Sequence, residues 1–168
     1  MVNQTASKHV ELIFQHPTKY DGKGMWELVK RTNLDLNSAY KYLMMAKYFS
    51  DTCVVVKEDD ELVGFITGFI EPDKPDTVFV WQVGVDASQR GRGIASRMLD
   101  ALLESPSCEN VKYLEATITD DNKASQKLFR GLARKRDTSC EVFETFPEEA
   151  FPEGHDAEFT YRIGPFSN

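Results

Sequence analysis

Residues 83–95 of the chain read VGVDASQRGRGIA, and this stretch decides the fold class. It starts inside a nearly continuous apolar run, residues 78–85, which is typical of a strand buried on both faces of a sheet. Gly91 and Gly93 follow in a loop, and residues 94–103 then carry apolar side chains at helical spacing. Glycines let backbone N–H groups approach an anion closely, and a helix N-terminus carries a partial positive charge. The strand–loop–helix unit therefore predicts a pyrophosphate site.

The loop matches neither of the common nucleotide-binding loops. No GK[ST] sequence follows it, as a Walker loop requires, and the third glycine of the dinucleotide motif GxGxxG is missing. Arg90 and Arg92 either add positive charge to the site or point to solvent. A plain glycine-rich turn that caps a core helix is the structural alternative.

Further elements are expected on both sides of this unit. On its N-terminal side the patterns predict strands at 10–14, 52–56 and 62–70, a helix around 25–29 and a second helix that begins near 37. On its C-terminal side they predict a strand at 111–118, a helix that begins near 122, and strands at 141–146 and 158–163. The order β-α-α-β-β-β-α-β-α-β-β describes a mixed α/β fold, and 168 residues suit a single domain, 1–168.

In the second helix Tyr40, Leu43 and Met44 share one face at helical spacing. Tyr40 therefore either packs in the core or serves a site. Tyr42 is expected to be structural.

The composition excludes several classes of protein. The net charge is −7, with 27 acidic against 20 basic residues, which argues against nucleic acid or an anionic membrane as partner. We see no run of about 18 apolar residues and no signal peptide at residues 1–5, so we expect a cytoplasmic protein. The three cysteines are far apart, and no Cys/His cluster predicts a metal site.

The spacing Arg90-x-x-Gly93-x-Ala95 resembles the acyl-CoA loop of the GNAT superfamily of N-acetyltransferases. A second stretch, NKASQKLF at 122–129, opens a helix directly after a strand, as the corresponding helix does in that superfamily. Asn122 also suits an ordinary helix cap, and both readings of this residue are compatible.

This resemblance implies the GNAT fold and acetyl-CoA as co-substrate, with no metal. It also implies that the strand carrying 81–85 splays from the strand carrying 113–119, so that the pantetheine arm enters the gap like an added strand. The implied coenzyme-binding residues are Val83, Val85, Arg90, Gly91, Arg92, Gly93, Ile94, Ala95, Asn122 and Ser125.

Three short stretches, 34–42, 79–83 and 155–165, resemble the diaminobutyrate acetyltransferase family. That family transfers acetyl from acetyl-CoA to the γ-amine of L-2,4-diaminobutyrate, the second of three steps to the compatible solute ectoine. The resemblance also implies a homodimer.

A site for this small diamino acid needs acceptors for two ammonium groups and a donor for one carboxylate. The predicted substrate-binding residues are Asp35, Asn37, Tyr40, Trp81, Glu115, His155 and Glu158. Each has a structural alternative: a helix cap, core packing, or simple exposure to solvent. Arg162 could hold the carboxylate, but a surface ion pair is the alternative.

The amine must lose a proton before it attacks, which costs about 4 kcal/mol at pH 7 for a group with a pKa near 10. Glu115 is the predicted proton acceptor, directly or through water, while Asp35 or Glu158 holds the ammonium. Trp81 and Tyr40 complete the predicted catalytic set. Phe129 stands where many superfamily members carry a tyrosine that protonates the leaving thiolate, so the general acid stays unassigned.

Two other functions remain open on the sequence. One is an acetyltransferase for a different amine, such as a polyamine or a lysine. The other is a catalytically silent acyl-CoA-binding module, to which Phe129 gives some support.

Overall fold

The computed structural model describes residues 10–167, and over this range it contains one seven-stranded sheet and four α-helices. The signal-peptide expectation rests on residues 1–5, which lie outside the described residues. The strands are β1 (Leu12–Gln15), β2 (Val54–Glu58), β3 (Glu61–Glu71), β4 (Lys74–Val85), β5 (Tyr113–Ile118), β6 (Ser139–Phe146) and β7 (Glu158–Gly164). The helices are α1 (Gly22–Val29), α2 (Ala39–Tyr48), α3 (Ile94–Leu103) and α4 (Lys123–Lys135).

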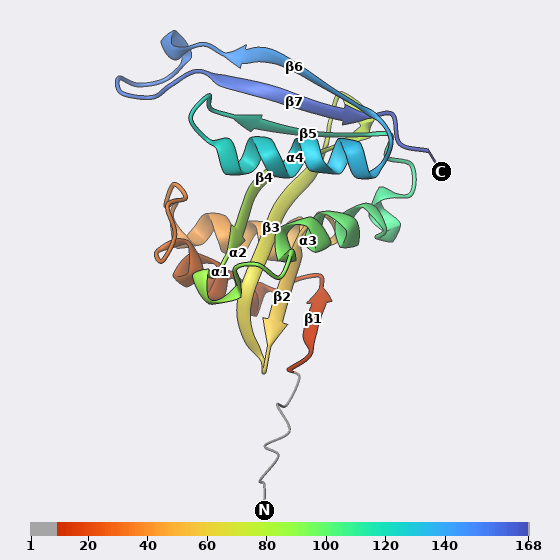
Figure 1. Ribbon diagram of the computed structural model, residues 1–168. Helices are drawn as coiled ribbons and strands as arrows, with labels where there is room; N and C mark the ends of the chain where they lie inside the picture. The colour runs from red at the N-terminus through yellow and green to blue at the C-terminus, as the bar shows by residue number, and fades with distance from the viewer. Residues whose placement is uncertain (1–9, 168) are drawn as a thin grey trace, which may run out of the picture.

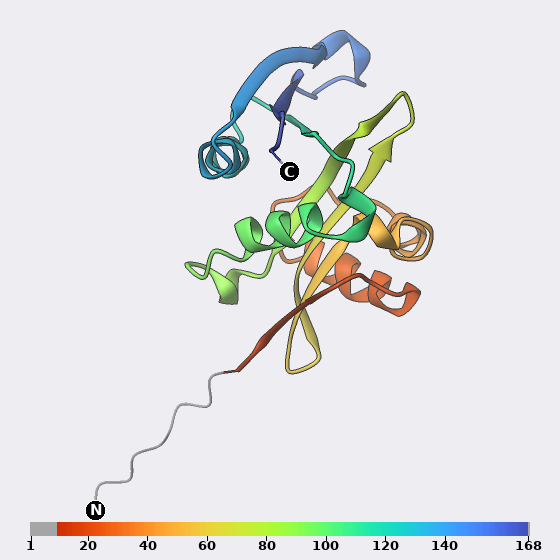
Figure 2. The same ribbon diagram turned by 90° about the vertical axis from the view of Figure 1, so that its right-hand side faces the viewer.

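The strands lie in the order β1-β2-β3-β4-β5-β7-β6, and only the β4–β5 pair is parallel. Helices cover both faces of the sheet (Figure 1). The apolar residues of α3 and α4 pack on one face in a large core cluster, while α1 and α2 form a second cluster on the other face. Figure 2 shows α3 on one side of the central strands and α1 and α2 on the opposite side.

The predicted order of elements is confirmed along the described chain. The predicted start of the central strand at residue 78 is wrong, because β4 already begins at Lys74. Glu71 and Lys74 pair across a tight turn, so β3 and β4 form one long hairpin and Pro75 lies inside the strand.

The predicted face of α2 is not the buried one. Tyr40 and Leu43 are exposed, whereas Tyr42, Met45 and Ala46 are buried against the rest of the protein. The helix reads AYKYLMMAKY, which is apolar on more than one side, so its spacing alone does not choose the face. The structural role expected for Tyr42 is confirmed, since its side chain is fully buried.

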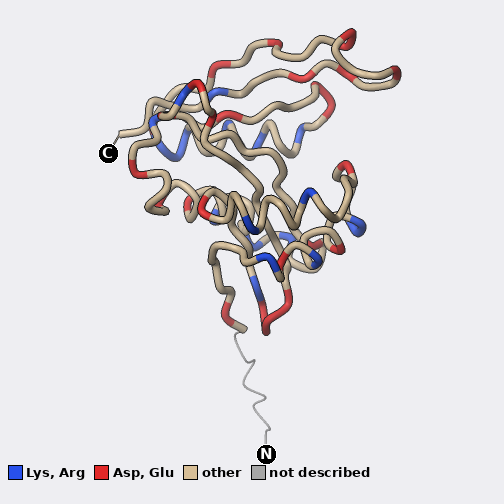
Figure 3. Tube along the Cα trace, turned by 180° about the vertical axis from the view of Figure 1, so that it is seen from behind, with Lys and Arg blue, Asp and Glu red and all other residues tan. Residues whose placement is uncertain are grey.

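Charged residues of both signs are spread over the described part of the molecule (Figure 3). Acidic residues gather at the tip of the β6–β7 connection, where Glu148 and Glu149 form part of a short 3-10 turn. Between residues 10 and 167, no helix has the length and apolar character needed to cross a membrane.

Candidate active site

The parallel strands β4 and β5 are hydrogen-bonded at one end only. We call the boundary between them the seam, its paired part the closed end and its unpaired part the open end. Thr77, Val78 and Phe79 of β4 pair with Tyr113, Leu114 and Glu115 of β5, and the pairing stops there. Beyond this point β4 continues to pair with β3, and β5 continues to pair with β7. The two strands therefore diverge, as the family resemblance implied.

A cavity of about 740 Å³ lies at this divergence. Its lining combines Val83 of β4, residues 117–119 at the end of β5, and Asn122, Ala124 and Ser125 at the start of α4. Residues 33–35 and the segment at 154–158 complete the wall. Four parts of the chain that are distant in sequence thus meet at the open end of the seam.

The edge of β4 that faces this gap carries backbone groups without a partner strand. Asp86 N–H donates to the carbonyl of Val63 on β3 at 2.8 Å. Because successive residues of a strand point their backbone groups to opposite edges, Gly84 also faces β3, while Val83 and Val85 face the gap. Their N–H and C=O groups are free to pair with an extended ligand, in the manner of an added strand.

Trp81 lies at an irregularity in β4. Thr67 pairs with Gln82 and Gly68 pairs with Val80, so Trp81 is an extra residue in its strand. Such a bulge re-aims side chains, and Trp81 is half exposed although its neighbour Val80 is buried. The ammonium of Lys41 on α2 lies over the indole ring, 3.6 Å from its centroid.

The N-terminus of α3 is open. Gly91 and Gly93 adopt positive φ values of 80° and 66°, which favour glycine, and a Cβ at either position would meet no neighbouring atom. Gly93 is the N-cap, and no side chain of the described residues caps the helix. The first N–H groups of α3, including those of Ile94 and Ala95, are therefore available to an anion.

The N-terminus of α4 differs, because Asn122 Oδ1 accepts a hydrogen bond from Ser125 N–H at 3.1 Å. The capping reading of Asn122 is thus confirmed, and the same residue also lines the cavity.

The two arginines of the glycine-rich loop have different surroundings. Arg92 donates to Glu58 Oε2 and to Gln89 Oε1, each at 2.6 Å, so its guanidinium is already hydrogen-bonded within the protein and its charge is balanced by Glu58. The hydrogen bond from Arg92, together with one from Gln89 Nε2, lowers the pKa of Glu58. Arg90 is exposed.

Glu158 is one of the carboxylates that line the cavity. Its Oε2 atom is buried and has no hydrogen-bond partner among the described residues. Burial raises its pKa; His155 opposes this effect and the carboxylate of Asp35 adds to it. His155 Nε2 lies 3.9 Å from Glu158 Oε1, and its ring stacks on Phe151. Thr117 also lowers this pKa, but the net direction is upward. A half-buried carboxylate with one oxygen left without a partner is suited to accept a proton.

Asp35 is held in place through its backbone. Gln82 Nε2 donates to the Asp35 carbonyl at 2.9 Å, and Tyr42 O–H donates to Gln82 Oε1 at 2.9 Å. Asn37 donates to the same carbonyl at 3.3 Å and is half-buried.

Glu115 does not line the cavity, because it lies at the closed end of the seam. Arg162 on β7 donates to it, and Lys74 Nζ lies 3.5 Å from the same oxygen. Although burial alone would raise its pKa, hydrogen bonds from Glu71 and Arg162 lower the pKa of Glu115. Arg162, which the sequence offered for the substrate carboxylate, is therefore occupied by Glu115, and its guanidinium also covers the Tyr113 ring at 3.7 Å.

Sequence reasoning did not find Glu71, which shares this end of the seam with Glu115. Burial raises the pKa of Glu71 to about 7, and the neighbouring Glu115 adds to the rise. No local pattern could have found it, because Glu71 and Glu115 lie on different strands and meet only in the assembled sheet.

The remaining predicted residues are scattered. Tyr40 is 68% exposed and is absent from the cavity lining, and Phe129 is buried in the α4 core. Within residues 10–167, no group of His, Cys, Asp and Glu could hold a metal ion.

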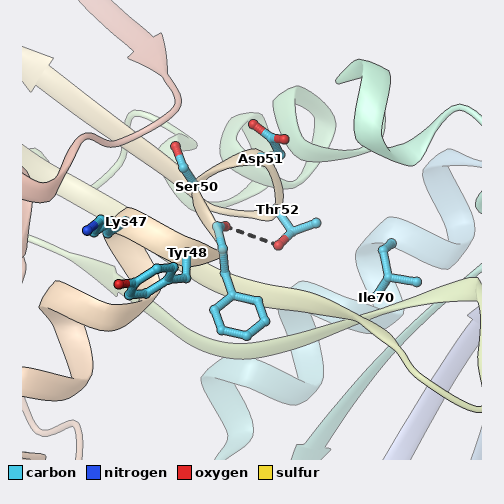
Figure 4. Close-up of a pocket in the computed structure, with 7 residues that line it drawn as sticks. Lys47, Tyr48, Ser50, Asp51, Thr52 and Ile70 are labelled. Atoms are coloured by element: carbon cyan, nitrogen blue, oxygen red, sulfur yellow. Dashed lines mark hydrogen bonds between the residues drawn. The ribbon is translucent and has the colours of Figure 1, made fainter.

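A smaller cavity of about 330 Å³ lies beside the C-terminal end of α2 (Figure 4). Thr52 donates to the carbonyl of Phe49 there at 3.1 Å. None of the predicted site residues lines this cavity, so the larger one is the candidate active site.

The family model "Acetyltransferase (GNAT) family" matches residues 23–133. A protein of Marinococcus halophilus named L-2,4-diaminobutyric acid acetyltransferase is 63% identical over 157 residues, which are 93% of this chain and 91% of that protein. A protein of the same name from Halomonas elongata is 43% identical over 92% of this chain and 82% of its own length.

Among solved structures, the diaminobutyrate acetyltransferase of Paenibacillus lautus, in complex with L-2,4-diaminobutyric acid and coenzyme A, matches with a TM-score of 0.90 and 40% identity. The match covers 95% of this chain and 98% of that one. Ard1 from Thermoplasma volcanium matches with a TM-score of 0.78 at 14% identity, which is a likeness of fold alone.

Proposed function

The chain belongs to the GNAT acetyltransferase family, within its diaminobutyrate acetyltransferases, and on this premise we propose that it transfers acetyl from acetyl-CoA to the γ-amine of L-2,4-diaminobutyrate. The observation that carries the proposal is the one-ended β4–β5 seam, which joins a free strand edge, an uncapped helix N-terminus and an acidic cavity.

The coenzyme side of the site is supported by backbone groups more than by side chains. The open N-terminus of α3 suits a pyrophosphate, and the Val83 and Val85 edge suits a pantetheine arm. Bound acetyl-CoA supplies the thioester that is cleaved. A β4 backbone N–H would donate to the thioester oxygen as it gains negative charge.

The amine side of the site is supported by the carboxylates of Asp35 and Glu158, both on the cavity wall. We assign the role of proton acceptor to Glu158, since its Oε2 atom has no hydrogen-bond partner among the described residues, while Glu115 is engaged with Arg162. Asp35 then holds the second ammonium of the substrate. Because Glu158 accepts the proton and Asp35 binds the other ammonium, the charge that holds one substrate nitrogen does not oppose deprotonation of the other.

The leaving thiolate needs little help, because thiols have pKa values near 8.5. Phe129 is buried and carries no proton, so we propose that solvent in the cavity supplies it.

The decisive experiment supplies acetyl-CoA with L-2,4-diaminobutyrate, spermidine or lysine, follows release of free thiol, and identifies the product by NMR. We expect rapid turnover with diaminobutyrate alone and acetyl on the γ-nitrogen. Turnover with only spermidine or only lysine would replace diaminobutyrate as the assigned substrate. Tight binding of acetyl-CoA without turnover of any of the three amines would favour a catalytically silent acyl-CoA-binding module.

We also propose that the chain forms a homodimer and serves ectoine synthesis. Val142, Phe143 and Phe146 on the edge strand β6 are 38%, 40% and 46% exposed, which is unusual for large apolar side chains on one strand. A second copy that covers this strand would bury them. Light scattering on the wild type and on Phe143→Asp tests the assembly, because a dimer formed there becomes monomeric in the variant.

A further inference from the structure

Lys41 has an unusual environment for a lysine. It lies in the first turns of α2, and its Nζ atom is buried, with no hydrogen-bond partner among the described residues. The nitrogen lies 3.6 Å from the centroid of the Trp81 ring and 5.1 Å from that of the Tyr42 ring. Aromatic faces attract a cation but satisfy none of its three N–H donors in the way that an oxygen does.

Lys41 and Trp81 are not part of the cavity lining, but hydrogen bonds of a neighbouring residue link them to the candidate active site. Tyr42 O–H donates to Gln82, and Gln82 donates to the backbone of Asp35, which lines the cavity. The carboxylate of Asp35 also acts on Lys41, since it raises the pKa of this amine. Burial has the larger, opposite effect, so that the pKa is lowered to about 8 and the amine is still mostly protonated at neutral pH.

A buried ammonium without an acceptor oxygen is costly, and such groups are usually paired with a counter-charge or a ligand. The proposed substrate carries one carboxylate and needs a cation to receive it. Arg162 is engaged with Glu115, and Arg92 is engaged with Glu58. Lys41, beside Trp81, is a cation whose N–H donors have no hydrogen-bond partner among the described residues and could therefore bind a carboxylate.

We propose that Lys41 Nζ binds the α-carboxylate of the diamino-acid substrate and so selects an amino acid over a simple diamine. This inference rests on the proposed function and deepens it. The Trp81 ring holds the ammonium from one side, and the substrate carboxylate would supply the acceptor oxygens that the folded chain does not. Lys41 is a binding residue in this proposal and takes no part in proton transfer.

The test compares Lys41→Met with the wild type on two substrates, L-2,4-diaminobutyrate and 1,3-diaminopropane, which is the same diamine without its carboxylate. We expect kcat/KM for diaminobutyrate to fall about 10- to 100-fold, mainly through KM, because a charge-assisted hydrogen bond is lost. Activity on 1,3-diaminopropane should stay within about threefold of the wild type, and Lys41→Arg should recover part of the loss.

Lys47→Met is the matched control, because Lys47 lies on the same helix, is exposed, and also lies near a tyrosine ring. Lys47→Met should leave kcat/KM for both substrates close to the wild-type values. Circular dichroism and the melting temperature verify that Lys41→Met is folded.

Equal losses on both substrates in a folded Lys41→Met would overturn the proposal and leave Lys41 as a support for Trp81. Unchanged kinetics on both would overturn it as well. A wild-type protein that binds acetyl-CoA and does not acetylate diaminobutyrate would instead overturn the proposed function, which separates the two failures.

Discussion

The two ends of the β4–β5 seam both contain carboxylates, and they differ in what surrounds them. At the closed end Glu115 is paired with Arg162 and Lys74. At the open end Glu158 has a buried oxygen with no partner among the described residues, and His155 is 3.9 Å away. Glu115 and Glu158 are on neighbouring strands of the same sheet, β5 and β7.

This difference separates two uses of buried charge. At the closed end Arg162 and Lys74 balance the charge of Glu115. Glu71 beside it has a buried Oε2 atom without a hydrogen-bond partner among the described residues, and burial raises its pKa to about 7. The open end leaves a carboxylate and an amine, those of Glu158 and Lys41, without hydrogen-bond partners. Unsatisfied polar groups destabilise a folded chain. Glu158 lines the cavity, and Lys41 is linked to it through Tyr42, Gln82 and Asp35, so a ligand in the cavity is suited to complete these two groups.

The largest expected effect belongs to Glu158→Gln. The amide cannot accept the proton, so kcat should fall about 100- to 1,000-fold, with a melting temperature close to that of the wild type. Steady-state kinetics with diaminobutyrate and a thermal melt measure both. Glu144→Gln, at an exposed position on β6, is the control and should be near wild type. A kcat within threefold of the wild type would remove Glu158 from the proton path.

Glu115→Gln should act on stability instead of chemistry. It leaves the charge of Arg162 without its carboxylate, which should cost about 2–3 kcal/mol of unfolding free energy because the pair is mostly buried. Urea unfolding measures this loss, and kcat on the folded enzyme should change less than tenfold. The reverse pattern, unchanged stability with kcat reduced more than 100-fold, would restore Glu115 as the proton acceptor.

The pH profile sharpens the contrast further. Because burial raises the pKa of Glu158, its carboxylate is lost at a higher pH than that of an exposed glutamate. Below that pKa, kcat should fall about tenfold per pH unit, and it should recover as the pH rises. Glu115→Gln should keep this acid limb. If the fall of kcat at low pH disappeared in Glu115→Gln, the titrating carboxylate would be Glu115 at the closed end and not Glu158.

Glu71→Gln should give the smallest effect. The pKa of Glu71 is raised to about 7, so ionisation of Glu71 beside Glu115 destabilises the fold as the pH rises from about 4.5 to 7. An amide removes this penalty, and the variant should be more stable than the wild type by about 1 kcal/mol at pH 8, after allowance for solvent screening. At pH 4 the two should melt together. A destabilised variant at pH 8 would mean that the ionised Glu71 is held by Lys74.

Much of the fold could be predicted from the sequence, because its signals are local. The apolar run, the two glycines and the helical stripe from Ile94 lie within one short stretch, and α3 begins at Ile94 as expected. The order of strands and helices followed from similar local patterns. The side chain of Asn122, read as a cap, does cap α4.

The candidate site could be predicted only in part. Asp35, Val83, Asn122, Ser125, His155 and Glu158 do meet at one cavity. Glu115 could not be separated from them by its sequence neighbours, since its partner Arg162 is on another strand. Lys41 was not singled out by the sequence, because Trp81, whose ring covers its amine, lies on β4, far along the chain.

The sequence by itself determined the elements, their order and the glycine-rich turn, because these depend on the spacing of apolar residues and on the φ values that glycine allows. The tertiary structure alone decided which face of α2 is buried, where β4 and β5 part, and which charged groups find a partner. Those outcomes depend on distances between residues far apart in the chain, and the energy of a buried charge is set by such neighbours.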